Sequence, residues 1–119
     1  MFKDAESSQK YPFNESPLQV DEVINCLRSR WGVTYDLQLL VRKNRLYLQI
    51  MWAFLEQQSF PMTEVAYRNH LNEIIEIINR SGQSNFVREW LATTGPKPRI
   101  GRALTLKLME DERLKEFVL

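Results

Sequence analysis

One cysteine and one histidine are the residues of this 119-residue chain that best suit nucleophilic or metal chemistry. Cys26 and His70 could form a catalytic pair only if the fold brought them together, and nothing in their spacing indicates that it does. One histidine and one cysteine also fall short of the usual ligand set of a zinc site. We therefore interpret Cys26 as a small filler of the core and His70 as a surface or boundary residue. We predict no catalytic residue, no metal and no cofactor.

The carboxylates and glycines follow no catalytic pattern either. Glu73 and Glu76 are three residues apart, so both can lie on one solvated helical face. The segment GPKPRIGR, residues 95–102, matches neither dinucleotide-binding nor P-loop spacing, and its two prolines lack the N–H groups of a phosphate cradle. These patterns predict a protein that is not an enzyme.

Part of that segment, residues 97–102, stands out for another reason, and we call it the basic loop. Lys97, Arg99 and Arg102 lie close together, and Pro96 and Pro98 restrict the backbone around them. Restricted backbone lowers the entropy cost of presenting the cations to a partner. Arginine suits planar anionic groups. We predict that these three cations bind a partner; the alternative is an exposed connector with ordinary solubilising charge.

A β-hairpin over residues 35–53 is the strongest structural signal. With a two-residue turn at 43–44, one face pairs apolar and aromatic residues only: Val41 with Leu46, Leu39 with Leu48, Leu37 with Ile50, and Tyr35 with Trp52. The other face pairs Arg42 with Arg45, Leu40 with Tyr47, Gln38 with Gln49, and Asp36 with Met51. Because side chains alternate between the two faces of a strand, the first set must be covered and the second points away from the cover.

The second hairpin face, which we call the outer face, is the other candidate contact surface. It places Leu40, Tyr47 and Met51 among polar side chains, with Arg42 and Arg45 beside the turn. An apolar patch inside a polar rim often marks a protein contact. The alternative is that the N-terminal or C-terminal segment of the chain covers this face.

Three predicted helices supply the cover for the apolar face. The first spans residues 17–31, with Ser16 as its N-cap, Gln19 completing a capping box and Gly32 ending it. The second spans residues 62–80, and the third begins at a capping Ser84 and frays at 93–95. Helical spacing places one apolar stripe on each. The stripe residues are Val20, Val23, Ile24, Leu27, Trp31, Tyr67, Leu71, Ile74, Ile75, Ile78, Phe86, Val87, Trp90 and Leu91.

A third strand completes the predicted sheet. Leu104, Leu106 and Leu108 alternate with polar residues within residues 102–109, which is typical of a half-buried strand. The element order is α-β-β-α-α-β, and the predicted fold class is α+β, a three-stranded antiparallel sheet covered by three helices. We expect one domain over residues 16–109, a flexible N-terminal tail over 1–15, and an acidic and apolar tail or short helix over 110–119.

Composition limits where such a protein works. Sixteen Lys and Arg against fifteen Asp and Glu give a net charge of +1, so any attraction to nucleic acid or anionic lipid must be local. A single cysteine fits a reducing compartment. No apolar run reaches the roughly 18–20 residues of a membrane span, and the first residues lack the apolar segment of a secretory signal. We expect a cytosolic or equivalent location.

The element order is shared with one form of the KH RNA-binding fold, so nucleic-acid binding through the basic loop remains the alternative function. The KH module clamps the nucleic-acid backbone with a G-x-x-G loop between its paired helices. Here the corresponding residues 81–84 read Ser-Gly-Gln-Ser, with a single glycine and no cation.

Several short motifs are specific as a set: WGV at 31–33, RLYL at 45–48, MWA at 51–53, LEQQSFP at 55–61 and KPRIGRA at 97–103. Through these motifs residues 16–108 resemble a family of short, uncharacterised proteins of cyanobacteria and plastids, a domain of unknown function. The resemblance assigns no chemical role to any residue. It implies a cyanobacterial cytoplasm or plastid stroma, and a helper in assembling or maintaining photosynthetic complexes. Our leading hypothesis is therefore a non-enzymatic protein-binding module with a protein partner.

Overall fold

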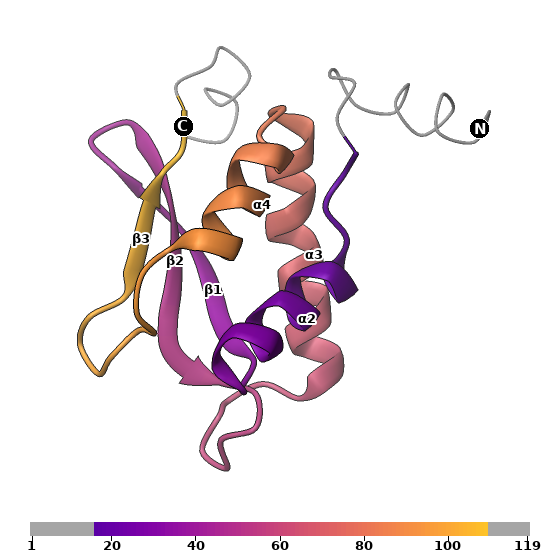
Figure 1. The fold of residues 1–119 in the computed structure, drawn as a ribbon, viewed down its shortest axis with the longest axis vertical. Coiled ribbons are helices and arrows are strands. Elements are labelled where there is room, and N and C mark those ends of the chain that lie inside the picture. Colours follow the sequence, from indigo (N-terminus) through magenta and orange to yellow (C-terminus); the bar gives the residue numbers. More distant parts are fainter. Residues whose placement is uncertain (1–15, 110–119) are drawn as a thin grey trace, which may run out of the picture.

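The computed structural model describes residues 16–109, and within them the elements follow the predicted order α-β-β-α-α-β. The helices are α2 (Val20–Trp31), α3 (Glu64–Arg80) and α4 (Ser84–Thr93), and the strands are β1 (Tyr35–Arg42), β2 (Arg45–Phe54) and β3 (Leu104–Lys107). The helices gather on one side of an antiparallel sheet whose strand order is β1-β2-β3 (Figure 1). The α+β fold class is thus confirmed, whereas the predicted tails lie outside the described residues.

The hairpin turns where the sequence predicts. Lys43 and Asn44 both have positive φ, 53° and 62°, which is the signature of a tight two-residue turn. The confirmed pairs are Arg42 with Arg45, Val41 with Leu46, Leu40 with Tyr47, Leu39 with Leu48, Gln38 with Gln49, and Leu37 with Ile50. On the other side of β2, Leu48 pairs with Leu106 and Ile50 with Leu104. The leucines of β3 therefore share the covered face with the centre of β2.

The core fills the space between this face and the helices. Leu48 and Ile50 on the central strand are fully buried, as are Leu27 of α2 and Leu71 of α3. Burying one such side chain contributes about 1.5–3 kcal/mol to stability. The other buried apolar residues are Leu18, Val23, Ile24, Tyr35, Leu37, Leu46, Tyr67, Ile74, Ile75, Ile78, Val87, Leu91 and Leu108.

At the base of the hairpin the predicted register is wrong. Tyr35 pairs with Phe54 instead of Trp52, because β2 gains two residues relative to β1 below the Leu37–Ile50 pair. The chain beyond this pair is held by the Leu55 N–H, which donates to the Thr34 carbonyl at 2.9 Å. The Tyr35 and Phe54 rings meet edge-on, with centroids 5.8 Å apart.

The same shift affects two other residues. Asp36 does not pair with Met51, because both lie in the irregular stretch of the ladder. Trp52 is half-buried, and its ring lies edge-on to that of Phe54 with the centroids 6.2 Å apart. It is therefore peripheral to the core in which the sequence analysis placed it.

The first helix begins later than predicted. Its first residue is Val20, and the N-cap is Gln19, which makes no side-chain capping bond, so the capping box from Ser16 is wrong. The cause lies far along the chain. The Leu18 N–H donates to Asn79 Oδ1 at 2.8 Å, and Asn79 Nδ2 donates to the Leu18 carbonyl at 3.1 Å. These two bonds hold the chain before Gln19 outside the helix.

Three other predicted positions differ from the structure. Ser84 is the first residue of α4, and Gln83 takes the N-cap position. Val41 has the predicted register, but it is 45% exposed because it lies near the hairpin turn, beyond the helical cover. Phe86 was assigned to the buried stripe of its helix and is 38% exposed. Its ring lines a pocket on the surface of the protein.

Helix α3 runs beside the outer edge of β1. The Tyr67 hydroxyl donates to the Tyr35 carbonyl at 2.7 Å, and His70 Nε2 lies 2.7 Å from the Leu37 carbonyl. Burial, with Asp36 adding to it, raises the pKa of Tyr67 far above its usual value, so its hydroxyl stays a donor. Side chains of a helix therefore satisfy main-chain groups that an edge strand leaves unpaired.

Candidate functional site

The two chemically reactive side chains do not meet. Cys26 of α2 donates from Sγ to the Leu91 carbonyl of α4 at 3.6 Å, whereas His70 of α3 contacts the Leu37 carbonyl of β1. Burial raises the pKa of Cys26, and nearby Arg30 opposes this only in part. A raised pKa leaves little of the reactive thiolate near neutral pH. The structure therefore provides no Cys–His pair, and Cys26 packs against the core as predicted.

Of the carboxylates within residues 16–109, that of Asp36 is buried. Its Oδ2 accepts a hydrogen bond from Gln38 Nε2 at 2.7 Å. Within the described part of the chain, Oδ1 has no hydrogen-bond donor and lies 3.5 Å from His70 Nε2. Burial raises the pKa of Asp36, although the Gln38 hydrogen bond and the His70 charge act in the opposite direction.

Asp36→Asn is expected to raise the melting temperature near neutral pH. Because the pKa of Asp36 is raised in the folded state, the folded protein binds the Asp36 proton more tightly than the unfolded chain does. Stability therefore falls as pH rises from the unfolded pKa, about 3.9, to the raised folded value, and the full penalty persists above it. Asparagine carries no charge and removes this penalty. Thermal denaturation across the acid range should show the gain in melting temperature of Asp36→Asn growing as pH rises, because only the unmutated protein loses stability through Asp36.

Asp21→Asn is the matched control for this experiment, because the Asp21 side chain is 76% exposed. It should not raise the melting temperature near neutral pH, because the exposed Asp21 carboxylate forms an ion pair with Arg68 Nη1 at 2.8 Å. A melting temperature for Asp36→Asn below that of the unmutated protein at neutral pH would contradict the prediction, and would show that the Asp36 charge stabilises the fold.

The basic loop forms a small hairpin of its own. The Arg99 N–H donates to the Arg102 carbonyl at 3.0 Å, and the Arg102 N–H donates back to the Arg99 carbonyl at 2.9 Å. Between them lie Ile100 and Gly101, and Gly101 has φ +74°, a conformation that favours glycine. Pro98 is fully buried and anchors the loop. Because opposed residues share a face, the two arginines present their side chains together.

The charge around this loop is one-sided. Residues 94–109 contain Lys97, Arg99, Arg102 and Lys107, all exposed, and no carboxylate. Neither arginine forms an ion pair with another residue in 16–109. Directly opposed like charges cost about 0.2–1 kcal/mol of stability. An anionic partner would offset that cost.

The predicted site residues fall into separate groups. Arg42 and Arg45 flank the hairpin turn at one end of the sheet, whereas the basic loop precedes β3 at the other end (Figure 1). The pairing of β3 explains this, since Leu104 pairs with Ile50 near the base of β2 and Lys107 pairs with Tyr47 near the turn. The basic loop and the hairpin arginines therefore do not form one site.

On the outer face the structure joins Leu40, Tyr47 and Lys107 into one row across the three strands. Leu40 and Tyr47 are half-buried, and Lys107 is exposed. Within residues 16–109 no helix lies over this face (Figure 1). Met51, predicted as a member of this patch, is half-buried and lies beyond the regular ladder.

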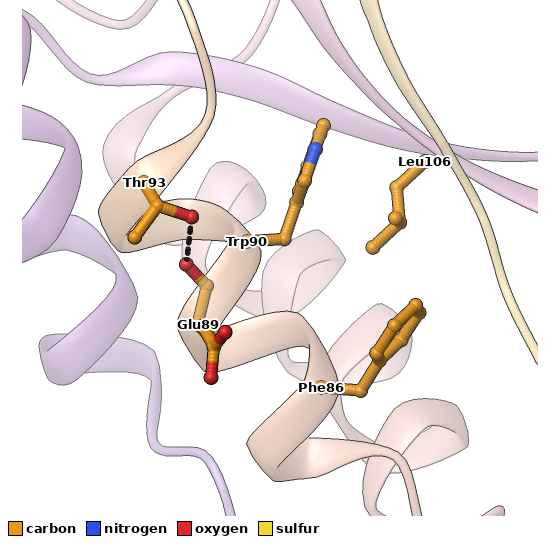
Figure 2. A pocket seen from close by; sticks show the side chains of 5 residues that line it. All are labelled: Phe86, Glu89, Trp90, Thr93 and Leu106. Atoms are coloured by element: carbon orange, nitrogen blue, oxygen red, sulfur yellow. Dashed lines mark hydrogen bonds between the residues drawn. The ribbon is translucent and has the colours of Figure 1, made fainter.

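A pocket between α4 and β3 was not predicted. It has a volume of about 230 Å³ and is lined by Phe86, Glu89, Trp90, Thr93 and Leu106. Figure 2 shows the Phe86 and Trp90 rings extending from α4 toward Leu106, with Glu89 and Thr93 on the other side of the helix. The Thr93 hydroxyl donates to the Glu89 main-chain carbonyl at 2.8 Å and is therefore occupied. The space beside β3 is thus apolar.

A signal for this pocket exists in the sequence. On the ten-residue helix α4, Val87 and Leu91 form one row of apolar residues at a spacing of four, and Phe86 and Trp90 form a second, adjacent row. The structure buries Val87 and Leu91 and leaves Phe86 exposed and Trp90 half-buried. One row is enough to form the buried stripe of a helix. The second apolar row is therefore the sequence signal that could have indicated a surface groove.

A polar cluster at Glu56 was also missed. Its carboxylate accepts from the Thr34 N–H at 2.8 Å and from the Thr34 hydroxyl at 2.7 Å, and Arg28 Nε donates to that hydroxyl at 2.8 Å. Burial alone would raise the pKa of Glu56, but the bonds from Thr34 and the Arg28 charge outweigh it and lower the pKa. These bonds attach the segment after β2 to the start of β1, which is a structural role.

Comparison with known proteins finds relatives over most of the chain. A family model described as a domain of unknown function, DUF3067, matches residues 21–118. The solution NMR structure of the Alr2454 protein from Nostoc sp. strain PCC 7120 is 32% identical, with a TM-score of 0.75, and the alignment covers 86% of this chain and 98% of that one.

A curated relative is much longer. The fatty acid synthase beta subunit TOXC of Cochliobolus carbonum is 32% identical over an alignment of 101 residues, which covers 80% of this chain. The chain spans only 5% of the length of that protein. Within the described residues, none of the helices has the length and apolar character needed to cross a membrane.

Proposed function

The chain belongs to the family described as a domain of unknown function, DUF3067, and from this premise we propose that it is a non-enzymatic protein-binding module. Its partner presents an acidic surface to the basic loop. We further propose that it works in the cytoplasm of a cyanobacterium, or in the stroma of a plastid, as a helper in the assembly or maintenance of photosynthetic complexes. The Nostoc relative supports this setting.

The observation that carries the proposal is the opposed pair Arg99 and Arg102. Two main-chain hydrogen bonds and the buried Pro98 hold their backbone in one conformation. Guanidinium groups bind carboxylates through two parallel hydrogen bonds, so a pre-arranged pair suits a surface that presents neighbouring carboxylates. Because the loop is already ordered, binding requires little further loss of backbone entropy.

Two observations favour a protein over a nucleic acid as the partner. Ile100 lies between the arginines at the tip of the loop and is 77% exposed, so the loop offers an apolar contact that phosphates do not use. The second observation is that the loop at the position of the KH clamp is buried and hydrogen-bonded within the protein. Ser81 and Gln83 are 1% and 3% exposed, and Gln83 bonds the main chain of Met109. Nucleic-acid binding by the basic loop remains the alternative that the test below addresses.

The proposal includes no catalytic role. The raised pKa of Cys26 and its separation from His70 argue against nucleophilic chemistry. The fatty acid synthase relative carries no activity over to this chain, because the match covers a small part of that protein.

Arg99→Glu combined with Arg102→Glu is expected to abolish partner binding while leaving the melting temperature nearly unchanged. Exposed charges contribute no more than about 1 kcal/mol each to folding, whereas reversed charges repel an acidic surface at contact. Affinity capture from a cyanobacterial lysate, compared between the unmutated protein and the double variant, measures the effect. Capture by the unmutated protein should weaken as salt rises, since salt screens exposed charges.

Arg42→Glu with Arg45→Glu is the matched control. It makes the same change of charge on another directly opposed arginine pair, at the far end of the sheet. If this control loses the partner and the Arg99/Arg102 variant keeps it, the partner binds at the hairpin turn and the basic loop is a connector. Nuclease treatment of the lysate separates the alternatives, because a nucleic-acid-mediated capture disappears with it.

A further inference from the structure

We propose that the free edge of β3, together with the pocket between α4 and β3, binds an extended segment of the partner as a fourth strand. In that segment an apolar residue stands between two acidic residues. This inference deepens the proposed protein-binding function and rests on it. Addition of a strand to an exposed sheet edge is a common mode of peptide recognition, in which main-chain bonds give affinity and side-chain pockets give specificity.

The register shows which main-chain groups of β3 are free. The Leu108 N–H donates to the Leu46 carbonyl at 3.0 Å, so this pair is hydrogen-bonded. Hydrogen-bonded and non-hydrogen-bonded pairs alternate along an antiparallel ladder. Leu106 and Leu104 therefore direct their N–H and C=O groups toward β2. Thr105 and Lys107 direct theirs away from the sheet, where no other strand of residues 16–109 lies.

The next outward-facing residue, Met109, shows what this edge binds. Its N–H donates to Gln83 Oε1 at 2.7 Å, and Gln83 Nε2 donates to its carbonyl at 3.2 Å. A side-chain carboxamide thus makes the paired bonds that a peptide group of a fourth strand would make. Gln83 also closes this end of the edge, so the open stretch covers Thr105 and Lys107.

The other edge of the sheet is less available at the base of β1. The outward carbonyls of Tyr35 and Leu37 on β1 are already engaged by Tyr67 and His70 of α3. Among the described residues, no side chain of α4 makes a hydrogen bond of this kind with the main chain of Thr105 or Lys107. An incoming strand would therefore find unpaired donors and acceptors at β3.

The surroundings of β3 determine the side chains of the partner segment. A residue opposite Leu106 shares its face and points into the pocket beside Phe86 and Trp90, which favours an apolar side chain. Residues opposite Thr105 and Lys107 share the outer face, where the exposed Lys107 favours a carboxylate. Arg102, just before β3, extends the positive charge along the same segment.

A fluorescein-labelled peptide of alternating aspartate and isoleucine is the probe for this site. Fluorescence polarisation should show saturable binding to the protein at low salt. The same peptide with N-methyl groups on the amides that would face β3 should bind at least about tenfold more weakly, since it cannot donate the main-chain bonds. A peptide of alternating lysine and isoleucine should not bind, because its charge is reversed. These three measurements use the unmutated protein.

Thr105→Pro and Thr105→Val form the matched pair of variants. Proline removes the outward N–H of Thr105 without removing a bond between β2 and β3, because that N–H faces away from β2. Valine keeps the N–H, and both variants lose the bond from Gln49 Nε2 to the Thr105 hydroxyl, 3.2 Å long. We expect Thr105→Pro to weaken peptide binding about tenfold relative to Thr105→Val. A circular dichroism melt verifies that each variant is folded.

Two results would overturn the proposal that a fourth strand forms. One is that the plain and the N-methylated peptides bind the unmutated protein equally well; the other is that the two Thr105 variants bind the plain peptide equally well. A labelled single-stranded oligonucleotide that displaces the peptide would also overturn it in favour of nucleic acid. If the edge test fails while Arg99→Glu with Arg102→Glu still abolishes partner capture, the protein-binding function stands and only the β3 edge is excluded. If both tests fail, both proposals are wrong.

Discussion

Leu48→Ala is expected to lower the free energy of unfolding by about 3–5 kcal/mol. Leu48 lies at the centre of β2, the middle strand, and its side chain is fully buried between β1, β3 and the helices. It is paired with Leu39 on one side and Leu106 on the other, so neither neighbour can easily move into the space that alanine would leave. Since domains of this size have about 5–15 kcal/mol of stability, the loss would be large.

Leu40→Ala is the matched control, with the same substitution one strand away on the outer face. Leu40 is half-buried, and no helix within residues 16–109 lies over it, so its truncation removes less apolar contact. We expect a loss of about 1 kcal/mol. Urea denaturation of both variants measures the difference. Equal losses would mean that the outer face is as well covered as the core face, and would remove Leu40 and Tyr47 from the candidate contact surface.

Asn79→Ala is expected to lower the free energy of unfolding by roughly 2–5 kcal/mol, because it leaves two buried main-chain groups without partners. Asn79 is 4% exposed, and its carboxamide bonds both the N–H and the C=O of Leu18, which is 3% exposed. These bonds attach the segment before α2 to the C-terminal half of α3. Loss of them should also increase amide hydrogen exchange at Leu18, which native-state exchange measured by NMR would detect.

Asn72→Ala is the control on the same helix. Asn72 is exposed, and alanine has the higher helix propensity, so this change should leave stability unaltered or raise it slightly. If Asn79→Ala is no worse than Asn72→Ala, water replaces the carboxamide at Leu18 and the bonds contribute little to the fold.

Most of the fold was predictable because its signals are local. The positive φ angles of Lys43 and Asn44 follow from a turn whose flanking residues alternate in character, and that turn then places Leu39 opposite Leu48. The alternating leucines of β3 likewise needed only their own spacing to be assigned to the covered face. The candidate site was less predictable, since the basic loop was identified but its pairing of Arg99 with Arg102 was not.

Long-range contacts explain three of the points at which the prediction was wrong. The start of α2 depends on Asn79, which lies 61 residues after Leu18, so no capping rule applied to Ser16 could locate it. The register at Tyr35 depends on how the chain returns from β2 to meet Thr34. The exposure of Phe86 depends on where α4 lies relative to β3.

By itself, the sequence determined the order of the elements, the face of the sheet that is covered, and the presence of a charged, proline-restricted loop. These properties depend on residue spacing and on turn chemistry, which act between near neighbours in the chain. Only the tertiary structure decided that the hairpin arginines and the basic loop lie at opposite ends of the sheet. It also decided that β3 is an edge strand with an apolar pocket beside it. Both follow from packing between segments far apart in the chain, where shape and main-chain hydrogen bonding select one arrangement among several that the same pattern allows.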